Sequence, residues 1–277
     1  MGDPLPAGGN YVQHDVFMGD HPIVIDADDN VGNRNVGREL FITSVRDEVY
    51  KVAHTKSGAI LFNAIKSLHK WLRIIPTWEL FYSAKNDTHR PREAAFNRDP
   101  ANKRKIGSTI EFTPRVCATG TGCVKDLLAR NEYIPSAQTV LFHELAHAMR
   151  DITGKIRDTN PVSGGIKDFN NEDEFYTIAV ENVFNSDTGG PIRGSHLGFK
   201  KLEPYFADSV KFFELGKSAF ALIDKYCTEN PAFTKQIGHL HLGFNPFRTY
   251  HHDRGAAANT ALCPRRLRTA SQASTTA

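Results

Sequence analysis

The sequence predicts an α+β fold built mainly as one domain, and three observations support this prediction. Amphipathic helical patterns recur at about 58–71, 135–152 and 208–227. Short β-rich runs, at 22–26 and 108–113, lie between or before these patterns. The 277 residues contain no internal repeat and are 40% hydrophobic and 23% charged, which is typical of a globular protein.

The first half of the chain is expected to alternate between short strands and helices. A strand at 22–26 is followed by a helix at about 43–51, a break at 55–58 and a second helix at 58–71. These boundaries follow from apolar residues at helical spacing and from the polar and glycine residues between them.

Strands and a long loop are expected next. Two short strands, 73–76 and 79–82, are separated around Pro76, and the polar, basic segment 85–105 is expected to be a loop. Alternating β-formers at 108–113 predict a strand. This strand either lies inside the sheet or forms the edge that lines a substrate cleft.

The second half is expected to be mainly helical. Ser136 can cap a helix that runs to Ile152, and Asn171 opens another helix from about 172 to 184. A Gly/Asn/Asp-rich loop, 154–171, joins them, and a further amphipathic helix is expected at 208–227.

Three segments describe the domain organisation. Residues 1–21 are expected to be a flexible N-terminal arm, residues 22–250 the folded domain, and residues 251–277 a basic, disordered tail. The net charge is +3, but 248–277 alone holds five Arg and one Asp, which leaves −1 for the other 247 residues. We therefore expect no nucleic-acid partner for the folded body.

Membrane insertion and classical secretion are not expected. No stretch approaches the roughly 20 apolar residues of a membrane helix, and the N-terminus lacks a signal peptide pattern. Delivery by a specialised secretion route and a cytoplasmic location both remain compatible with this sequence. Four cysteines without a C-x-x-C pair do not suggest a disulfide scaffold or a cysteine zinc site.

The motif His143-Glu144-Leu145-Ala146-His147 has the spacing H-E-x-x-H within the predicted helix. Residues four apart share a helix face, so both imidazoles can bind one Zn²⁺. Glu144 would then act as the general base on a zinc-bound water. The motif predicts a zinc-dependent hydrolase.

A catalytic zinc needs a third protein ligand, and the acidic start of the helix at 172 is the best source. We favour Glu174. Glu181 lies two turns further, about 10.5 Å along the helix, so both cannot bind one ion. Glu172, Asp173 and Glu181 remain alternatives, and acids in a first turn also favour the helix dipole by themselves. Glu181 would otherwise orient a ligating histidine.

Zinc-dependent hydrolysis also uses a donor for the developing oxyanion. Arg193 and His196 follow the acidic helix after a Gly-Gly turn and are both candidates. The alternative for Arg193 is a salt bridge with Glu181.

These residues together resemble the NleD-type effector zinc metallopeptidases, which bacteria deliver into host cells. The resemblance runs from about Phe41 to Phe199. It rests on T-x-x-G-x-x-L-F at 55–62, the strand 108–113, F-H-E-L-A-H-A at 142–148, E-x-x-T-I and V-E-N at 174–182, and P-I-R at 191–193.

The resemblance implies a zincin-like, gluzincin-type fold with an active-site helix, a small mixed sheet and a following helix that carries a Glu ligand. It implies an endopeptidase that cuts a host protein, with His143, His147 and Glu174 on Zn²⁺, Glu144 as the base and Arg193 nearby. Residues 200–277 have no counterpart in it. The alternative function is a catalytically silent zincin-fold module that binds a protein partner.

Overall fold

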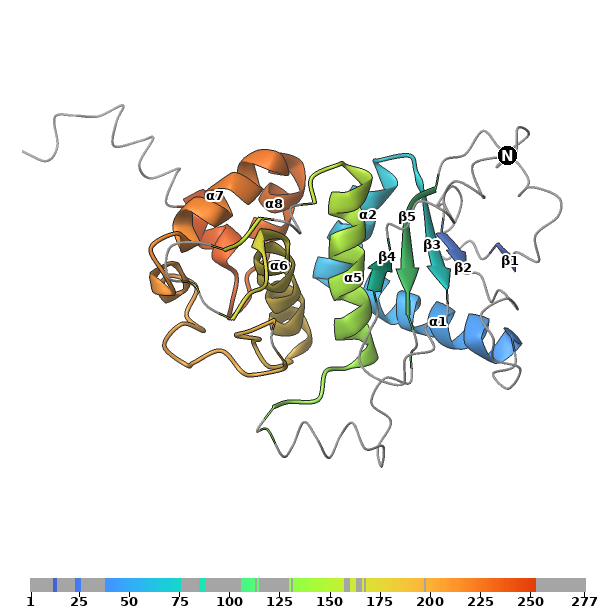
Figure 1. Cartoon of the computed structure of the whole chain (residues 1–277), viewed down its shortest axis with the longest axis horizontal. Coiled ribbons are helices and arrows are strands. Elements are labelled where there is room, and N and C mark those ends of the chain that lie inside the picture. The colour runs from blue at the N-terminus through green and yellow to red at the C-terminus, as the bar shows by residue number, and fades with distance from the viewer. Residues whose placement is uncertain are drawn as a thin grey trace, which may run out of the picture.

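The chain forms a small sheet with helices packed beside it, which confirms the predicted α+β class (Figure 1). The computed structural model describes residues 12–13, 23–25, 38–75, 85–87, 106–112, 132–156, 160–162, 168–196 and 198–252, with residues 114, 130 and 166. The expected strand at 79–82, most of the arm and nearly all of the tail lie outside these residues.

The sheet has five strands in the order β1-β2-β3-β5-β4. They are β1 (Val12–Gln13), β2 (Ile23–Ile25), β3 (Trp71–Ile75), β4 (Lys85–Asp87) and β5 (Ile106–Glu111). The three central strands are parallel, with Ile25 opposite Ile74 and Ile74 opposite Ile110. Both outer pairs are antiparallel.

Two of these strands differ from the sequence-based expectation. β1 lies within the segment expected to be a flexible arm, and β4 lies within the expected loop 85–105. Neither segment has an apolar alternation, so only the backbone pairing with a neighbour identifies it as a strand. Because β4 occupies the edge, the strand that contains Thr109 and Ile110 is interior, and both residues are buried.

Two helices connect β2 to β3. They are α1 (Arg38–Ala53) and α2 (Lys56–Lys66). The predicted break before the second helix is its N-terminal cap, since the Thr55 side chain accepts a hydrogen bond from the Gly58 N–H. α2 ends earlier than expected, and β3 takes the chain from Trp71. A turn with His69 at φ 52° separates the two elements.

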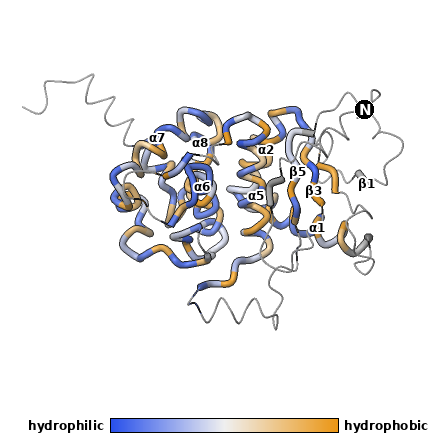
Figure 2. The backbone as a smooth tube through the Cα atoms, in the orientation of Figure 1, coloured by the Kyte–Doolittle hydropathy of each residue, from blue (hydrophilic) through white to orange (hydrophobic). Residues whose placement is uncertain are grey.

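The central helix is α5 (Ala137–Ile152), which lies between the sheet and α6 (Figure 1). Ser136 caps it as predicted by accepting a hydrogen bond from the Thr139 N–H at 3.0 Å. One side of the helix packs with the apolar core, and figure 2 shows hydrophobic residues along both β3 and α5. Nearly the whole helix is buried, including its histidines.

α6 (Glu172–Thr188) packs along α5. Asn171 caps it as predicted, with its side chain accepting a hydrogen bond from the Glu174 N–H at 2.8 Å. The helix ends at Gly189, whose φ of 75° is the left-handed conformation that favours glycine.

The C-terminal part differs most from expectation. Instead of one helix at 208–227 there is a short 3₁₀ helix, η1 (Lys211–Glu214), and then α7 (Ala219–Glu229) and α8 (Pro231–Gly238). Another helical segment, 246–252, extends past residue 250, where the tail was expected to begin. Aromatic residues in these separate helices, among them Phe212, Tyr226 and Phe247, are all buried. The apolar pattern therefore continues across the helix boundaries, and amphipathic spacing alone did not show where one helix ends and the next begins.

The helices of the described residues include none that is both long and apolar enough to cross a membrane.

Candidate metal centre

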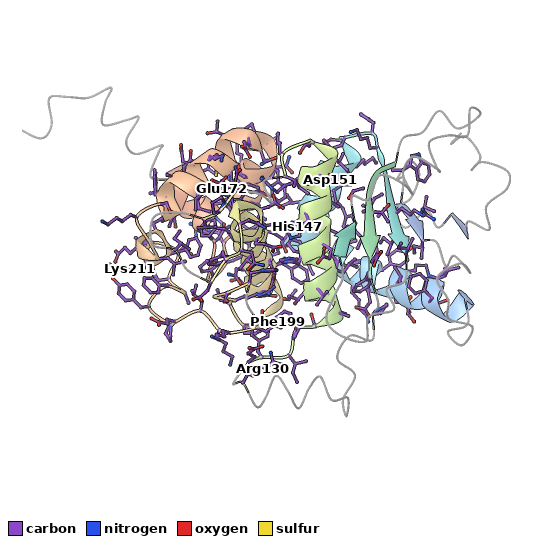
Figure 3. All side chains as sticks on the ribbon, viewed as in Figure 1. Arg130, His147, Asp151, Glu172, Phe199 and Lys211 are labelled. Atoms are coloured by element: carbon purple, nitrogen blue, oxygen red, sulfur yellow. The ribbon has the colours of Figure 1, made fainter. Side chains whose placement is uncertain are left out.

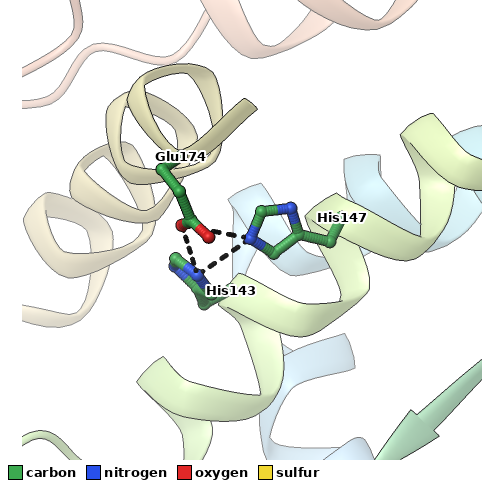
Figure 4. A group of neighbouring side chains, drawn as sticks. All are labelled: His143, His147 and Glu174. Carbon is green, nitrogen blue, oxygen red and sulfur yellow. Dashed lines mark hydrogen bonds and ion pairs between the residues drawn. The ribbon is translucent and has the colours of Figure 1, made fainter. Parts of the chain in front are cut away.

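Two neighbouring helices bring three ligand-type side chains together. His143 and His147 lie one turn apart on the side of α5 that faces α6, and Glu174 projects from the first turn of α6 (Figure 4). The two histidines are buried, and Glu174 is nearly so. All three ligand atoms lie within 4.8 Å of one another.

The spacing of these atoms suits a single metal ion. Nε2 of His143 lies 3.1 Å from Nε2 of His147. Oε2 of Glu174 lies 3.4 Å from the first nitrogen and 3.3 Å from the second. Atoms bound at about 2.0–2.1 Å to one tetrahedral zinc are about 3.3 Å apart.

Glu174 Oε2 is a buried oxygen without a hydrogen-bond partner. Burial alone would raise the pKa of this carboxyl group, but the two imidazoles hold it well below its usual range. The side chain is therefore a buried anion whose Oε2 lies against the two Nε2 atoms. A buried anion in this state needs a cation.

The outer nitrogen of each imidazole contacts a second carboxylate. Nδ1 of His143 is 2.8 Å from Oε2 of Glu181, and Nδ1 of His147 is 2.6 Å from Oδ2 of Asp173. A carboxylate at Nδ1 accepts the N–H there and leaves the Nε2 lone pair for a metal. Both Nε2 atoms point to the same space because their Nδ1 atoms are held.

Opposing effects set the pKa values of these histidines. Burial lowers the pKa of His143, but the contacts with Glu174 and Glu181 outweigh it and the pKa is raised. Burial also lowers the pKa of His147, but the charge of Glu174 and the hydrogen bond to Asp173 outweigh it and raise the pKa well above the usual value. The centre therefore attracts positive charge, whether protons or a metal ion.

Arg193 lies beside the centre, but its guanidinium contacts Glu181 and its own loop and none of the three candidate ligands in the contacts described. Its Nη1 is 3.1 Å from Glu181 Oε2, and its Nε donates to the carbonyl oxygen of Ser195 at 2.8 Å. The guanidinium also packs on the Phe199 ring, at 4.4 Å from the ring centroid. This is the salt bridge that was the alternative to an oxyanion role.

His196 lies at the margin of the centre. Its Nε2 is 3.3 Å from Glu174 Oε2, and its ring is parallel to that of His143 with 6.5 Å between centroids. The side chain is 28% exposed, against 9% for His143. Burial and the neighbouring positive charges lower the pKa of His196 to about 4, although Glu174 opposes the shift.

The other predicted residues are also placed. Glu144, beside His143 in α5, is buried with 7% exposure, and its charge contributes to the raised pKa of His147. Glu172 points to α7, where it pairs with Lys225 at 2.6 Å (Figure 3). Each alternative third ligand thus contacts a partner other than an Nε2 atom, and Glu174 alone among these acids lies close to the Nε2 atoms of both His143 and His147.

Sequence reasoning missed several supporting residues, among them Arg150 and Tyr133. Arg150 donates through Nε to Asp173, and Tyr133 donates its hydroxyl proton to Glu181 at 3.4 Å. Arg150 lies three residues after His147, on the same helix face, and a charged residue at this place on a buried helix was an available signal. Nothing near Tyr133 in the sequence connects it to the centre.

A cluster of two imidazoles and a carboxylate can hold a divalent cation, and imidazole with carboxylate suits zinc among other metals. Comparison of the chain with models of protein families gave no match, and none was found among curated proteins or solved structures.

Proposed function

We propose that the protein is a zinc-dependent endopeptidase with a zincin-like fold. The observation that carries the proposal is the convergence of His143 Nε2, His147 Nε2 and Glu174 Oε2 at distances of 3.1–3.4 Å. The helical H-E-x-x-H arrangement supports it, since both histidines lie on α5 with Glu144 between them.

The charge of the centre supports a dication. Four buried or nearly buried carboxylates, Glu144, Asp173, Glu174 and Glu181, stand against the guanidinium groups of two arginines. With both histidines neutral, these carboxylates outnumber the arginines, so the centre carries a net negative charge that a divalent ion would reduce. His143, His147 and Glu174 would hold the ion.

A bound divalent ion would supply Lewis acidity, which acidifies water and polarises a carbonyl group. Glu144 is the base in this proposal. It takes a proton from water as the hydroxide oxygen adds to the peptide carbonyl carbon, and it gives that proton to the amine nitrogen as the C–N bond breaks. The products are a carboxylic acid and an amine.

His196 is our candidate for the donor to the oxyanion. With its pKa lowered to about 4, the imidazole is neutral at neutral pH and keeps one N–H to donate. Its partial exposure next to Glu174 supports this role, because a donor to the substrate must be accessible from outside the protein. Arg193 then supports Glu181 and does not contact the substrate.

The substrate in this proposal is a protein. The resemblance to NleD-type effectors further implies that the enzyme itself is delivered into a host cell. The motif residues that carry the resemblance lie in or next to α2, β5, α5 and α6, and at 191–193.

The first experiment measures metal content in the purified full chain. We expect about one zinc per chain in the wild type and its loss in His143→Ala and Glu174→Gln. Glu172→Gln is the matched control, because it lies in the same helical turn but pairs with Lys225. Wild-type protein without stoichiometric metal, in buffers free of chelator, would contradict the proposal.

The second experiment tests the base. Glu144→Ala should keep its zinc and lose about 10²–10⁴-fold in cleavage rate on a peptide library. A wild type that binds zinc and cleaves no member of the library would favour the silent binding module instead.

A further inference from the structure

A line of buried contacts leads from His147 away from the metal centre. Asp173 Oδ2 lies 2.6 Å from His147 Nδ1, and Asp173 Oδ1 accepts a hydrogen bond from Arg150 Nε. Burial would raise the pKa of Asp173, but His147 and Arg150 lower it. Asp173 is therefore an anion between a ligand imidazole and a guanidinium.

Arg150 is held in turn by the C-terminal part of the chain. Its side chain is 0% exposed, and Nη1 lies 3.4 Å from Oε2 of Glu229 at the end of α7. The guanidinium lies over the Tyr226 ring of the same helix at 5.1 Å and over the Tyr176 ring of α6 at 4.7 Å. Nη2 donates to the Lys155 carbonyl oxygen at 2.6 Å.

The contacts behind His143 also consist of a carboxylate and an arginine, but other parts of the chain hold that arginine. Glu181 contacts Nδ1 of His143, and Arg193 contacts Glu181. Arg193 is fixed within its own loop and by Asn182, whose side chain bonds the backbone of Arg193 at 2.6 and 2.7 Å. Of these two sets of contacts, only the one behind His147 includes residues of α7.

We propose that α7 is part of the metal centre and acts through Arg150. Tyr226 and Glu229 keep the guanidinium in place, the guanidinium keeps the Asp173 carboxylate oriented, and Asp173 turns the Nε2 atom of His147 to the metal. These are positioning residues. The inference rests on the proposed metal function and extends the centre into residues 219–229, beyond the part that carries the family resemblance.

The competing explanation is that Arg150 only joins three helices. Burial of a guanidinium is costly, and paired contacts with α6 and α7 would then contribute to stability alone. The two explanations differ in one measurable respect. A purely structural tie changes the melting temperature, whereas a positioning tie also changes metal affinity and the state of the His147 imidazole.

The experiment compares variants of the full chain by zinc affinity, measured in competition with a chromophoric chelator. We expect Arg150→Lys to lower the affinity about 10-fold, the lower end of the range for outer partners of metal-binding histidines. Glu229→Gln should lower it less. Lys225→Met is the matched control, because it removes a different ion pair of α7, Lys225–Glu172 at 2.6 Å, which joins α7 to α6 and contacts no histidine.

A spectroscopic measurement separates positioning from stability. In the zinc-loaded protein, the Nδ1–H protons of both ligand histidines should be seen by NMR as slowly exchanging signals. Glu229→Gln and Arg150→Lys should shift or broaden the His147 signal and leave the His143 signal unchanged. The two imidazoles thus serve as test and internal control in one molecule.

Zinc affinity within twofold of the wild type in both Arg150→Lys and Glu229→Gln, with an unchanged His147 signal, would overturn the inference and leave the metal site intact. Absence of zinc binding in the wild type would overturn the proposed function together with it. If Arg150→Lys does not fold, Glu229→Gln decides, since Glu229 is 18% exposed at the end of its helix.

Discussion

At the residue scale, both nitrogens of each candidate ligand imidazole face a carboxylate. Nε2 of His143 and of His147 faces Glu174, while the two Nδ1 atoms face Glu181 and Asp173. In the proposed centre, this arrangement favours Glu174 as the third ligand. Glu172, Asp173, Glu174 and Glu181 all lie on α6, but they differ in which imidazole nitrogen, if any, they reach.

His196 provides the test at this scale. We expect His196→Ala to keep zinc affinity within twofold and to lose about 10²-fold in kcat with a small change in KM, as for loss of one oxyanion donor. His196→Gln keeps an N–H donor and should recover part of the rate. A loss of zinc equal to that of His143→Ala would instead make His196 a ligand, because its Nε2 already lies 3.3 Å from Glu174.

At the element scale, one helix supplies most of the acidic groups of the centre. Asp173 and Glu174 lie in the first turn of α6, and Glu181 lies two turns later. The Asn171 cap holds that first turn through the Glu174 N–H at 2.8 Å. The far end of α6 is tied to α2, where the Ser57 N–H and hydroxyl both donate to Asp187 at 2.9 Å.

The two helix caps allow a paired test. Asn171→Ala and Ser136→Ala each remove one capping bond, and each should cost about 1 kcal/mol in the free energy of unfolding. Only Asn171→Ala should also weaken zinc binding, because the turn that it caps carries Glu174. Urea denaturation and chelator competition measure the two effects. Equal zinc affinity in both variants would contradict a role for the cap in the site.

At the scale of the whole molecule, the apolar core and the charged centre share the same two helices. Leu141 and Leu145 of α5 are fully buried in the core, while His143 and His147 on the same helix face α6. Without metal, the stability of this interface depends on the protonation of the histidines and the ionisation of the carboxylates that face them.

This coupling gives a pH dependence with a definite sign. The pKa values of His143 and His147 are raised above 6.5, so their contribution to stability is complete below pH 6.5 and is lost as the pH rises through the raised values. The pKa of Glu174 is lowered from 4.5, so its contribution is present above pH 4.5 and is lost at lower pH.

We therefore expect metal-free protein to melt at a higher temperature at about pH 6 than at about pH 8.5. Zinc must displace the protons, so the increase in melting temperature on adding zinc should be larger at the higher pH. Calorimetry with and without chelator measures both. The control is His143→Gln with His147→Gln, whose profile should be flatter above pH 6. A wild-type profile equally flat there would contradict the charge assignment.

The sequence alone predicted the α+β class and the caps Ser136 and Asn171. It also favoured Glu174 as the third ligand, with Glu172, Asp173 and Glu181 left as alternatives. These depend on short-range rules: amphipathic spacing, side chains that bond the backbone three residues on, and helix geometry. The i, i+4 spacing of the histidines is of the same kind. For this reason, a chain without a matching relative still showed where its candidate centre lies.

Tertiary structure alone decided the rest. The edge position of β4, the break between η1 and α7 and the place of Arg150 under Tyr226 all depend on contacts between segments far apart in sequence. The same holds for Asp173 and Glu181, which reach opposite imidazoles because α5 and α6 pack side by side. Local spacing shows that a helix can present a charge, but only the packed partner determines which atom that charge meets.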